Sequence, residues 1–347
     1  MSSPAASQAV ATSSTAPLLV DVEGLTVGFR TGKTSVVRAV NGVDLQVRRG
    51  EVLAILGESG SGKSVTLRAL LRLNPPKITT VSGRIAVAGL DVNALEPRAL
   101  QDFRGGVASM IFQDPGLALD PVYRVGDQIA ETVMRHKGVS RTAARKRALD
   151  LFERVRIPSA ERRLDAYPHE LSGGMRQRAM IALALSCDPQ LLLADEPTTA
   201  LDATVQIQIL LILREVQRAL GLSVIFVTHD IGVAVEIADR VAVMYAGRIV
   251  ETGPVEAIIR RPQHPYTIGL LSTRAHGGRL QGHRLPAIPG SPPDLSALPP
   301  GCAFAPRCSR PDARCRSSQP EQMAVGPAHL VRCIKPPEPP RATSNTA

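Results

Sequence analysis

The sequence contains no tryptophan and few other aromatic residues, with 4 tyrosines and 6 phenylalanines among 347 residues. Proteins that bind single-stranded nucleic acid stack the bases on aromatic side chains, and this sequence has no Lys/Arg run interleaved with aromatics. The formal net charge of +10 also suits an anionic membrane surface or a basic soluble protein. We therefore expect no nucleic-acid partner.

Long hydrophobic runs are also missing. No uninterrupted apolar segment approaches the ~20 residues that a membrane-spanning helix needs. The N-terminal segment lacks the charged start and apolar core of a secretory signal, because residues 1–17 are rich in Ser, Ala and Thr. We expect a cytoplasmic chain with a disordered leader at residues 1–17 and a disordered tail at residues 336–347.

The first third of the chain has the pattern of an antiparallel sheet. Apolar and polar residues alternate at 25–29 and at 43–47, which is typical of half-buried strands, and residues 81–87 form a further predicted strand. Residues 116–170 are helical and basic in pattern, so we expect an inserted helical subdomain there.

The second half predicts a parallel sheet. Continuous apolar runs at 191–194 and 224–227 indicate buried strands, and an amphipathic helix at 205–220 separates them. Strands that alternate with helices predict an α/β core. Ligands of such sheets bind beyond the carboxyl ends of the strands, which directs attention to the residues that follow each run.

The most informative segment is residues 57–64, Gly-Glu-Ser-Gly-Ser-Gly-Lys-Ser, between an apolar run and a helix-like stretch. Glycines at this spacing let backbone N–H groups surround phosphate oxygens, and the following helix directs its positive end toward them. Lys63 then reaches the β- and γ-phosphates, and Ser64 offers its hydroxyl to Mg²⁺. A flexible turn that happens to contain lysine is the alternative, which the flanking strand and helix disfavour. We predict a nucleoside-triphosphate site formed by Gly57, Glu58, Ser59, Gly60, Ser61, Gly62, Lys63, Ser64 and Val65.

Two acidic residues, Asp195 and Glu196, directly follow the run at 191–194. An acid at a strand end can hold Mg²⁺, and its neighbour can accept the proton of the water that attacks the γ-phosphate. We assign Asp195 to Mg²⁺ and Glu196 to the general base. The alternative is that both residues only begin the turn at 197–199.

The order of the motifs resembles that of the nucleotide-binding subunits of ABC transporters. The phosphate loop is followed by Leu171-Ser172-Gly173-Gly174-Met175, then Asp195-Glu196, then Ala200-Leu201-Asp202, and then His229 after the next strand. The resemblance covers residues 18–253. It implies an ABC-type P-loop ATPase core with an antiparallel β subdomain and a helical insert. We expect this nucleotide-binding domain at residues 18–260, with the helical subdomain at about 116–170.

By this resemblance, two segments would act on a partner subunit. Ser172, Gly173 and Gly174 would close on the γ-phosphate of ATP bound by a second ATPase, again with a helix N-terminus facing an anion. Asp202 would communicate across that dimer. Ser172 and Asp202 are also ordinary helix N-cap residues, and both interpretations can hold together.

The resemblance implies further contacts within the subunit. His229 would contact the γ-phosphate, and Gln113 would touch Mg²⁺ or the attacking water and couple hydrolysis to the helical insert. Without the resemblance, each is an unremarkable polar residue at a strand end. Phe29 is the nearest candidate for stacking on adenine, with Arg30 and Val37 as substitutes, although Phe29 also suits a core position.

A group of four cysteines lies in a proline-rich segment near the C-terminal end of the sequence. They are Cys302, Cys308, Cys315 and Cys333, with the spacing C-x5-C-x6-C-x17-C. Little apolar sequence is available there to build a core, and cytosolic redox conditions disfavour disulfides, so a metal site is the better explanation. The spacing lacks the C-x2-4-C knuckles of structural zinc, whereas a [4Fe–4S] cluster tolerates wider spacing. Zinc and four free thiols remain alternatives. Cys187, on a helix end, is expected to be a core residue.

Neighbouring segments resemble the C-terminal region of oligopeptide/dipeptide importer ATPases. They are His264-Pro265-Tyr266-Thr267, Leu285-Pro286-Ala287-Ile288-Pro289-Gly290 and Cys302-Ala303-Phe304-Ala305-Pro306-Arg307-Cys308. The resemblance implies that these cysteines can ligate an iron–sulfur cluster, which ranks [4Fe–4S] above zinc, in a structural or regulatory role. We expect this small irregular region at residues 261–335.

The resemblance implies an ATP-hydrolysing subunit that energises import of di- or oligopeptides. It would pair with a second, related ATPase, act on two integral-membrane permease subunits at the cytoplasmic face of the inner membrane, and depend on an extracytoplasmic solute-binding protein. Import of nickel or another small solute is an alternative, because other subunits choose the solute. Residues 114–121 read Asp-Pro-Gly-Leu-Ala-Leu-Asp-Pro where the family typically has Asp-Pro-Met-Thr-Ser-Leu-Asn-Pro, so no particular membrane partner is implied.

Two alternatives come from other classes of protein. A soluble ABC ATPase acting on ribosomes or DNA is disfavoured, because the chain has one cassette without a charged linker or a long coiled coil. A metal-sensing regulator would use the cysteine cluster as its working site.

Overall fold

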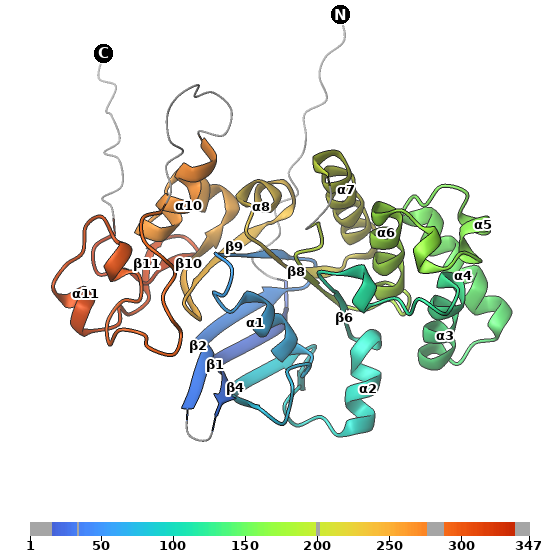
Figure 1. Ribbon diagram of the computed structural model, residues 1–347, viewed down its shortest axis with the longest axis horizontal. Helices are drawn as coiled ribbons and strands as arrows, with labels where there is room; N and C mark the ends of the chain where they lie inside the picture. The colour runs from blue at the N-terminus through green and yellow to red at the C-terminus, as the bar shows by residue number, and fades with distance from the viewer. Residues whose placement is uncertain (1–15, 33–34, 199–201, 276–287, 337–347) are drawn as a thin grey trace, which may run out of the picture.

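The computed structural model describes residues 16–32, 35–198, 202–275 and 288–336. Nearly all of the predicted leader and tail lies outside these ranges, as do Ala200 and Leu201 of the predicted dimer-coupling motif. The described residues form two sheets, with a group of helices at one end and a small C-terminal region at the other (Figure 1).

The antiparallel subdomain consists of β1 (Leu18–Thr31), β2 (Ser35–Arg48), β4 (Thr79–Val87) and β5 (Leu90–Asp91), in the order β2-β1-β4-β5. Side chains of β1 alternate between the core and the outside, with Val20, Val22, Leu25 and Val27 fully buried. The predicted antiparallel strands are confirmed. Strands β1 and β2 extend beyond the predicted residues at both ends, whereas β4 begins earlier than predicted and ends at the predicted residue.

The larger sheet has the order β11-β12-β10-β9-β3-β8-β7-β6, and the five strands from β9 to β6, at one edge of the sheet, are parallel. These strands are β3 (Val52–Leu56), β6 (Ala108–Ile111), β7 (Leu191–Asp195), β8 (Ser223–Thr228) and β9 (Arg240–Tyr245). Every residue of β3, β7 and β8 is buried, which explains their continuous apolar sequence and confirms the predicted parallel sheet.

Each face of this sheet contributes to a different core. Leu53 and Ile55 of β3 pack with the antiparallel subdomain and with α1 (Lys63–Leu70), whereas Val52, Ala54 and Leu56 pack on the opposite side with the helices. Those helices include α6 (Gly173–Ala184), α7 (Ala203–Leu220) and α8 (Ile231–Ile237). The phosphate loop thus starts from a strand that is covered on both faces.

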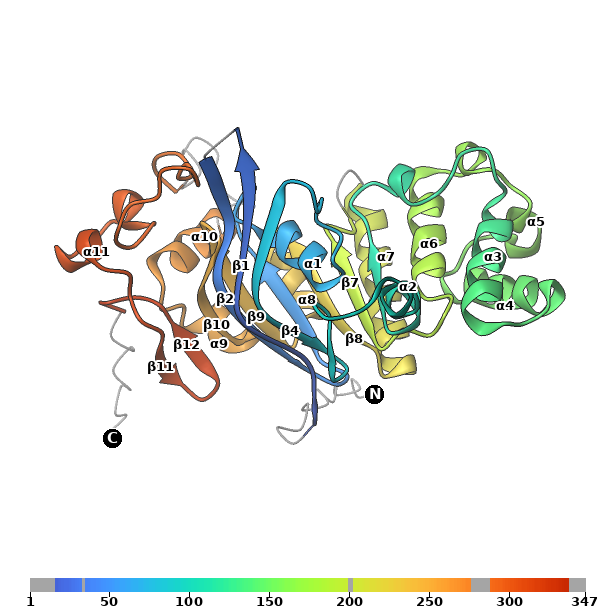
Figure 2. The same cartoon turned by 90° about the horizontal axis from the view of Figure 1, so that it is seen from below.

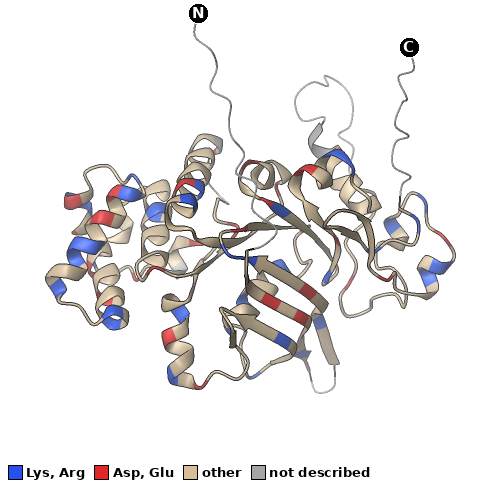
Figure 3. Ribbon diagram, turned by 180° about the vertical axis from the view of Figure 1, so that it is seen from behind, with Lys and Arg blue, Asp and Glu red and all other residues tan. Residues whose placement is uncertain are grey.

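The helical part lies beyond the β6 edge of the sheet (Figure 2). It contains η1 (Pro115–Leu117), α3 (Val125–Lys137), α4 (Arg141–Arg154), α5 (Ala160–Leu164) and η2 (Pro168–Glu170), and a separate helix α2 (Pro97–Gly106) precedes β6. Acidic and basic residues are interspersed along these helices, as the red and blue ribbon segments of Figure 3 show. Ion pairs such as Arg141–Asp127 and Arg145–Asp165, both at 2.8 Å, offset part of the positive charge.

The C-terminal region is joined to the main sheet. It comprises β10 (Arg248–Pro254), α9 (Val255–Arg260), α10 (Pro265–Ala275), η3 (Ala305–Arg307), α11 (Arg314–Ser317), β11 (Met323–Gly326) and β12 (His329–Val331). Strand β12 pairs antiparallel with β10. Strands β11 and β12 are too short to show a pattern in the sequence, and their pairing partners largely determine them.

A buried carboxylate anchors this junction. Glu251 of β10, which is 1% exposed, accepts hydrogen bonds from the backbone N–H groups of Gln263 (2.7 Å) and His264 (2.8 Å), and lies 2.7 Å from Nε2 of His329.

None of the helices in the described ranges has the length and apolarity to cross a bilayer.

Candidate functional site

The phosphate loop and the predicted catalytic residues lie at the carboxyl ends of the parallel strands. Because β3, β6, β7 and β8 run in the same direction, the residues after them emerge together. These are the loop that begins at Gly57, then Gln113, the pair Asp195 and Glu196, and His229.

Glycine is required at two positions of the phosphate loop. A Cβ on Gly57 would lie 2.3 Å from the carbonyl oxygen of Met244 in β9, and a Cβ on Gly62 would lie 2.3 Å from that of Ala39. Gly62 also has a φ of 103°, which side-chain-bearing residues rarely adopt. The loop therefore packs directly against the backbone of both sheets.

Lys63 lies inside the loop. It is 4% exposed, and its Nζ donates to the carbonyl oxygens of Gly57 (2.8 Å) and Glu58 (2.9 Å). Burial lowers the pKa of this ammonium, against the opposing effect of the nearby carboxylates of Glu196, Asp195 and Glu58. A buried cation that is bonded only to neutral carbonyls is suited to an anionic ligand.

Ser64 and Asp195 come together from different elements. The Ser64 hydroxyl at the start of α1 donates to Oδ1 of Asp195 at the end of β7, at 2.6 Å. The other oxygen, Oδ2, is buried without a hydrogen-bond partner, with Nη2 of Arg68 at 3.9 Å. Burial raises the pKa of Asp195. A hydroxyl and a carboxylate oxygen without a hydrogen-bond partner are ligands that Mg²⁺ prefers, so this pair fits the ion.

Glu196 lies between the two other predicted catalytic residues. Its Oε2 accepts from Nε2 of Gln113 at 3.3 Å, and its Oε1 is 3.4 Å from Nδ1 of His229. Its backbone has a φ of 47°, an uncommon conformation for a residue other than glycine that turns the chain sharply after β7. The Glu196 carboxylate is close enough to Lys63 of the phosphate loop to act on the pKa of that ammonium.

The predicted partner-facing residues are at the N-termini of other helices. Ser172 accepts from the N–H of Met175 at 3.3 Å and caps α6, and Asp202 accepts from the N–H of Val205 at 2.9 Å and caps α7. Both capping alternatives are confirmed. Ser172, Gly173 and Asp202 are exposed, and both cartoon views draw α6 apart from α1 (Figures 1 and 2).

Phe29 is half-buried and packs against the core of the antiparallel subdomain, as Val65 does. It lies opposite Val37 in the β1–β2 pairing. Arg30, in contrast, is exposed, and its guanidinium donates to the carbonyl oxygen of Lys77. Phe29 and Val37 thus lie on the face of the antiparallel sheet that packs against the core.

The four predicted cysteine ligands lie around one small cavity of about 20 Å³, together with His264 and Arg310. Burial raises the pKa of Cys302 and of Cys333. Nη2 of Arg310 is buried without a hydrogen-bond partner. Within the described residues, no group of three or more His, Cys, Asp or Glu side chains is arranged to hold a metal ion. The thiols are gathered, but not in the geometry of a single-metal site.

Sequence comparison matches two segments of the chain to known families. Residues 40–199 match the ABC transporter family, and residues 250–315 match the oligopeptide/dipeptide transporter, C-terminal region. A putative peptide import ATP-binding protein of Brucella abortus is 49% identical over 328 residues, which cover 91% of this chain and 97% of that protein. The chain belongs to the ABC transporter family. The dipeptide transport ATP-binding protein DppD of Bacillus subtilis is 48% identical over 317 residues, 91% of this chain and 94% of DppD.

Solved structures agree with this assignment. The dimeric ATP-binding cassette MJ0796, bound to ADP and Pi, has a TM-score of 0.61 and 28% identity, covering 68% of this chain and 98% of that one. CbiO1 of Clostridium perfringens has a TM-score of 0.59 and 30% identity, covering 70% and 90%. The predicted family, the ABC cassette fold and the ATPase class are confirmed.

Proposed function

We propose that this ABC ATPase energises the import of di- or oligopeptides. The observation that carries the proposal is the presence, in one chain, of a phosphate loop whose Ser64 meets Asp195, of Glu196 beside Gln113, and of a C-terminal region that matches the oligopeptide/dipeptide family. The relatives named above as peptide and dipeptide transport proteins support the same solute class.

In the proposed reaction, the loop N–H groups and Lys63 bind the phosphates of ATP, and Phe29 contacts the adenine. Glu196 accepts a proton from the attacking water, whose oxygen forms a bond to the γ-phosphorus while the bond to the β,γ-bridging oxygen breaks. Gln113 and His229 hold the Glu196 carboxylate in place and are positioned to contact the water and the γ-phosphate.

Ser64, Asp195 and Gln113 would hold Mg²⁺. When bound, the ion supplies positive charge against the phosphate oxygens. Oδ2 of Asp195, which has no hydrogen-bond partner, and the hydroxyl of Ser64 are the atoms of this chain that favour the assignment.

We assign Ser172, Gly173 and Gly174 to the ATP of a second, related ATPase subunit, and Asp202 to communication between the two. Helix N-termini carry a partial positive charge that suits a γ-phosphate. Hydrolysis would release this contact. The complex would include two permease subunits and an extracytoplasmic solute-binding protein, with this chain bound at the cytoplasmic face of the membrane.

We further propose that Cys302, Cys308, Cys315 and Cys333 bind a [4Fe–4S] cluster. A tetrahedral zinc site with Zn–S bonds of ~2.3 Å needs sulfurs about 4 Å apart, whereas a cluster holds them more widely. The guanidinium of Arg310, whose buried Nη2 has no hydrogen-bond partner, lines the same cavity and complements the negative charge of four metal-bound thiolates. The bound cluster would supply a cross-link for a segment with a small core.

The cluster is tested by iron and sulfide analysis after anaerobic purification. Wild type and Cys187→Ser should carry iron and sulfide with visible absorbance, and Cys308→Ser should lose both, since Cys187 lies buried elsewhere in the fold. Colourless protein with stoichiometric zinc would overturn the proposal.

Transport is tested by uptake of labelled di- and tetrapeptides in a strain that lacks the chain. Wild type and Glu256→Gln should restore uptake, and Glu196→Gln should not; Glu256 is a matched exposed acid on α9. Complementation of nickel uptake without any effect on peptides would instead favour the alternative solute.

A further inference from the structure

The C-terminal region makes a direct ionic contact with the phosphate loop. Nη1 and Nη2 of Arg307 donate to Oε2 and Oε1 of Glu58 at 2.8 and 3.0 Å, so the pair is bidentate. The two residues are 249 positions apart in the chain. Glu58 is the second residue of the phosphate loop, whereas Arg307 lies immediately before Cys308.

Arg307 is held firmly on the side of the C-terminal region. It is 8% exposed, its Nε donates to the carbonyl oxygen of Pro289 at 2.9 Å, and its Nη1 donates to the hydroxyl of Tyr245 at 3.3 Å. The guanidinium carbon also lies 5.9 Å from the ring centres of Tyr245 and Phe304. A bidentate, largely buried pair of this kind is geometrically specific, in contrast to an exposed ion pair.

A second contact holds the backbone of the same loop residue. The N–H of Glu58 donates to the hydroxyl of Tyr266 on α10 at 2.8 Å. Tyr266 is fully buried, and its ring centre lies 4.6 Å from that of Tyr245 and 5.5 Å from that of Phe304. Both the main chain and the side chain of Glu58 are therefore fixed by the C-terminal region.

The position of Glu58 affects the groups that bind phosphate. Its carbonyl oxygen accepts from Nζ of Lys63, and the N–H of Ser61 donates to the same oxygen at 3.2 Å. A shift of Glu58 would therefore displace both the lysine and the loop turn. Positioned donors lose binding energy when their geometry relaxes.

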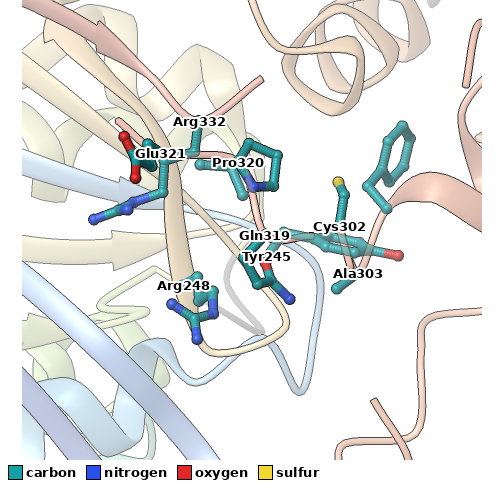
Figure 4. Close-up of a pocket in the computed structure, with 10 residues that line it drawn as sticks. Tyr245, Arg248, Cys302, Ala303, Gln319, Pro320, Glu321 and Arg332 are labelled. Atoms are coloured by element: carbon teal, nitrogen blue, oxygen red, sulfur yellow. The ribbon is translucent and has the colours of Figure 1, made fainter. Parts of the chain in front are cut away.

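The same contacts lead back to the cysteines. Phe304 and Arg307 lie between Cys302 and Cys308, and the N–H of Cys302 donates to the carbonyl oxygen of Cys315 at 2.7 Å. Figure 4 shows Tyr245 beside the segment with Cys302 and Ala303, and these residues line one pocket of about 160 Å³. A continuous set of packed side chains thus joins the cysteine segment to the loop.

We propose that Arg307 and Tyr266 are positioning residues that hold the phosphate loop in its nucleotide-binding shape, so that the C-terminal region sets the affinity for ATP. The proposal rests on ATP binding at this loop and is independent of the transported solute and of any bound metal.

The test is a double-mutant cycle in the full-length chain with Glu58→Gln, Arg307→Gln and the double variant, and with Tyr266→Phe. Dissociation constants for MgATP are measured by calorimetry, and KM, kcat and melting temperature are measured for each. Each single change should raise the dissociation constant and KM about fivefold or more, as is typical of coupling between sites. The double variant should be no weaker than the worse single variant, because both changes remove one contact. The value of kcat at saturating ATP should remain within about twofold.

Arg316→Gln is the matched control, because Arg316 carries the same charge in the same region and is exposed. It should leave the dissociation constant unchanged. If Arg307→Gln does not fold, Glu58→Gln and Tyr266→Phe decide the question, since each keeps the side-chain volume. Additive effects of the two single changes, or lower melting temperatures with unchanged affinity and KM, would overturn the proposal.

Discussion

Replacing Glu196 with glutamine should stop ATP turnover while leaving the site assembled. The amide has nearly the same size, so it fits a side-chain position that is 14% exposed. The amide can still contact both neighbours of Glu196. In the wild-type protein, Nε2 of Gln113 lies 3.3 Å from Oε2 of Glu196, and Nδ1 of His229 lies 3.4 Å from Oε1. What the amide cannot do is accept the proton of the attacking water, which isolates the general-base step from binding.

General-base catalysis by a positioned side chain contributes about 10²- to 10⁴-fold to a rate. At ~1.4 kcal/mol for each factor of ten, the expected increase in the activation free energy is about 3–5 kcal/mol. Affinity for ATP should be unchanged, because Lys63 and the loop N–H groups remain in place. ATP should therefore accumulate in a closed dimer.

The assay compares steady-state phosphate release, retained ATP and oligomeric state for wild type, Glu196→Gln and Glu256→Gln. Glu256 forms an exposed ion pair with Arg260 at 3.0 Å, so its change to glutamine should alter hydrolysis by less than about twofold. Phosphate release by Glu196→Gln within about tenfold of wild type would refute the base assignment.

Three further changes test other parts of the molecule. Burial raises the pKa of Asp195 in the folded protein, so the stability of the fold decreases as the pH rises from the ordinary pKa of an aspartate through the raised pKa. Asp195→Asn should therefore raise the melting temperature at neutral pH and abolish Mg²⁺-dependent hydrolysis. An unchanged or lower melting temperature would contradict the buried charge. Glu251→Ala leaves the buried N–H groups of Gln263 and His264 without an acceptor, which costs about 1–3 kcal/mol for each group. The free energy of unfolding, measured in denaturant, should therefore fall by about 2–6 kcal/mol. A loss below ~1 kcal/mol would show that Glu251 does not anchor the C-terminal region. A Cβ on the exposed Gly173 meets nothing within 4 Å, so Gly173→Ala should keep the wild-type melting temperature. It should lower the rate of ATP hydrolysis by the dimer at least about tenfold. A wild-type rate would argue against the assignment of Gly173 to the ATP of the partner subunit.

Local sequence was sufficient for the elements that position the nucleotide. The spacing of apolar residues predicts these elements, because each of them has either one buried face or two. They are the strands β1, β2, β7 and β8 and the helices α1 and α7. The glycines of the phosphate loop and the acids after β7 were identifiable, since their chemistry requires those residue types at those spacings.

Contacts between distant segments were not accessible in this way. No pattern along the chain indicates that Glu58 is held by Arg307 and Tyr266, because a single charged residue in a loop has many possible partners. The anchor at Glu251 is a further case, since its partners Gln263, His264 and His329 come from two separate segments.

The amino-acid sequence by itself determined the ATPase chemistry and the α/β core, because phosphate binding and strand burial impose short, regular patterns on neighbouring residues. Only the tertiary structure decided that Ser64 meets Asp195, that Glu196 lies between Gln113 and His229, and that the cysteine-containing region contacts the phosphate loop. These contacts depend on how the strand ends and the C-terminal segment come together in space, which no local spacing specifies.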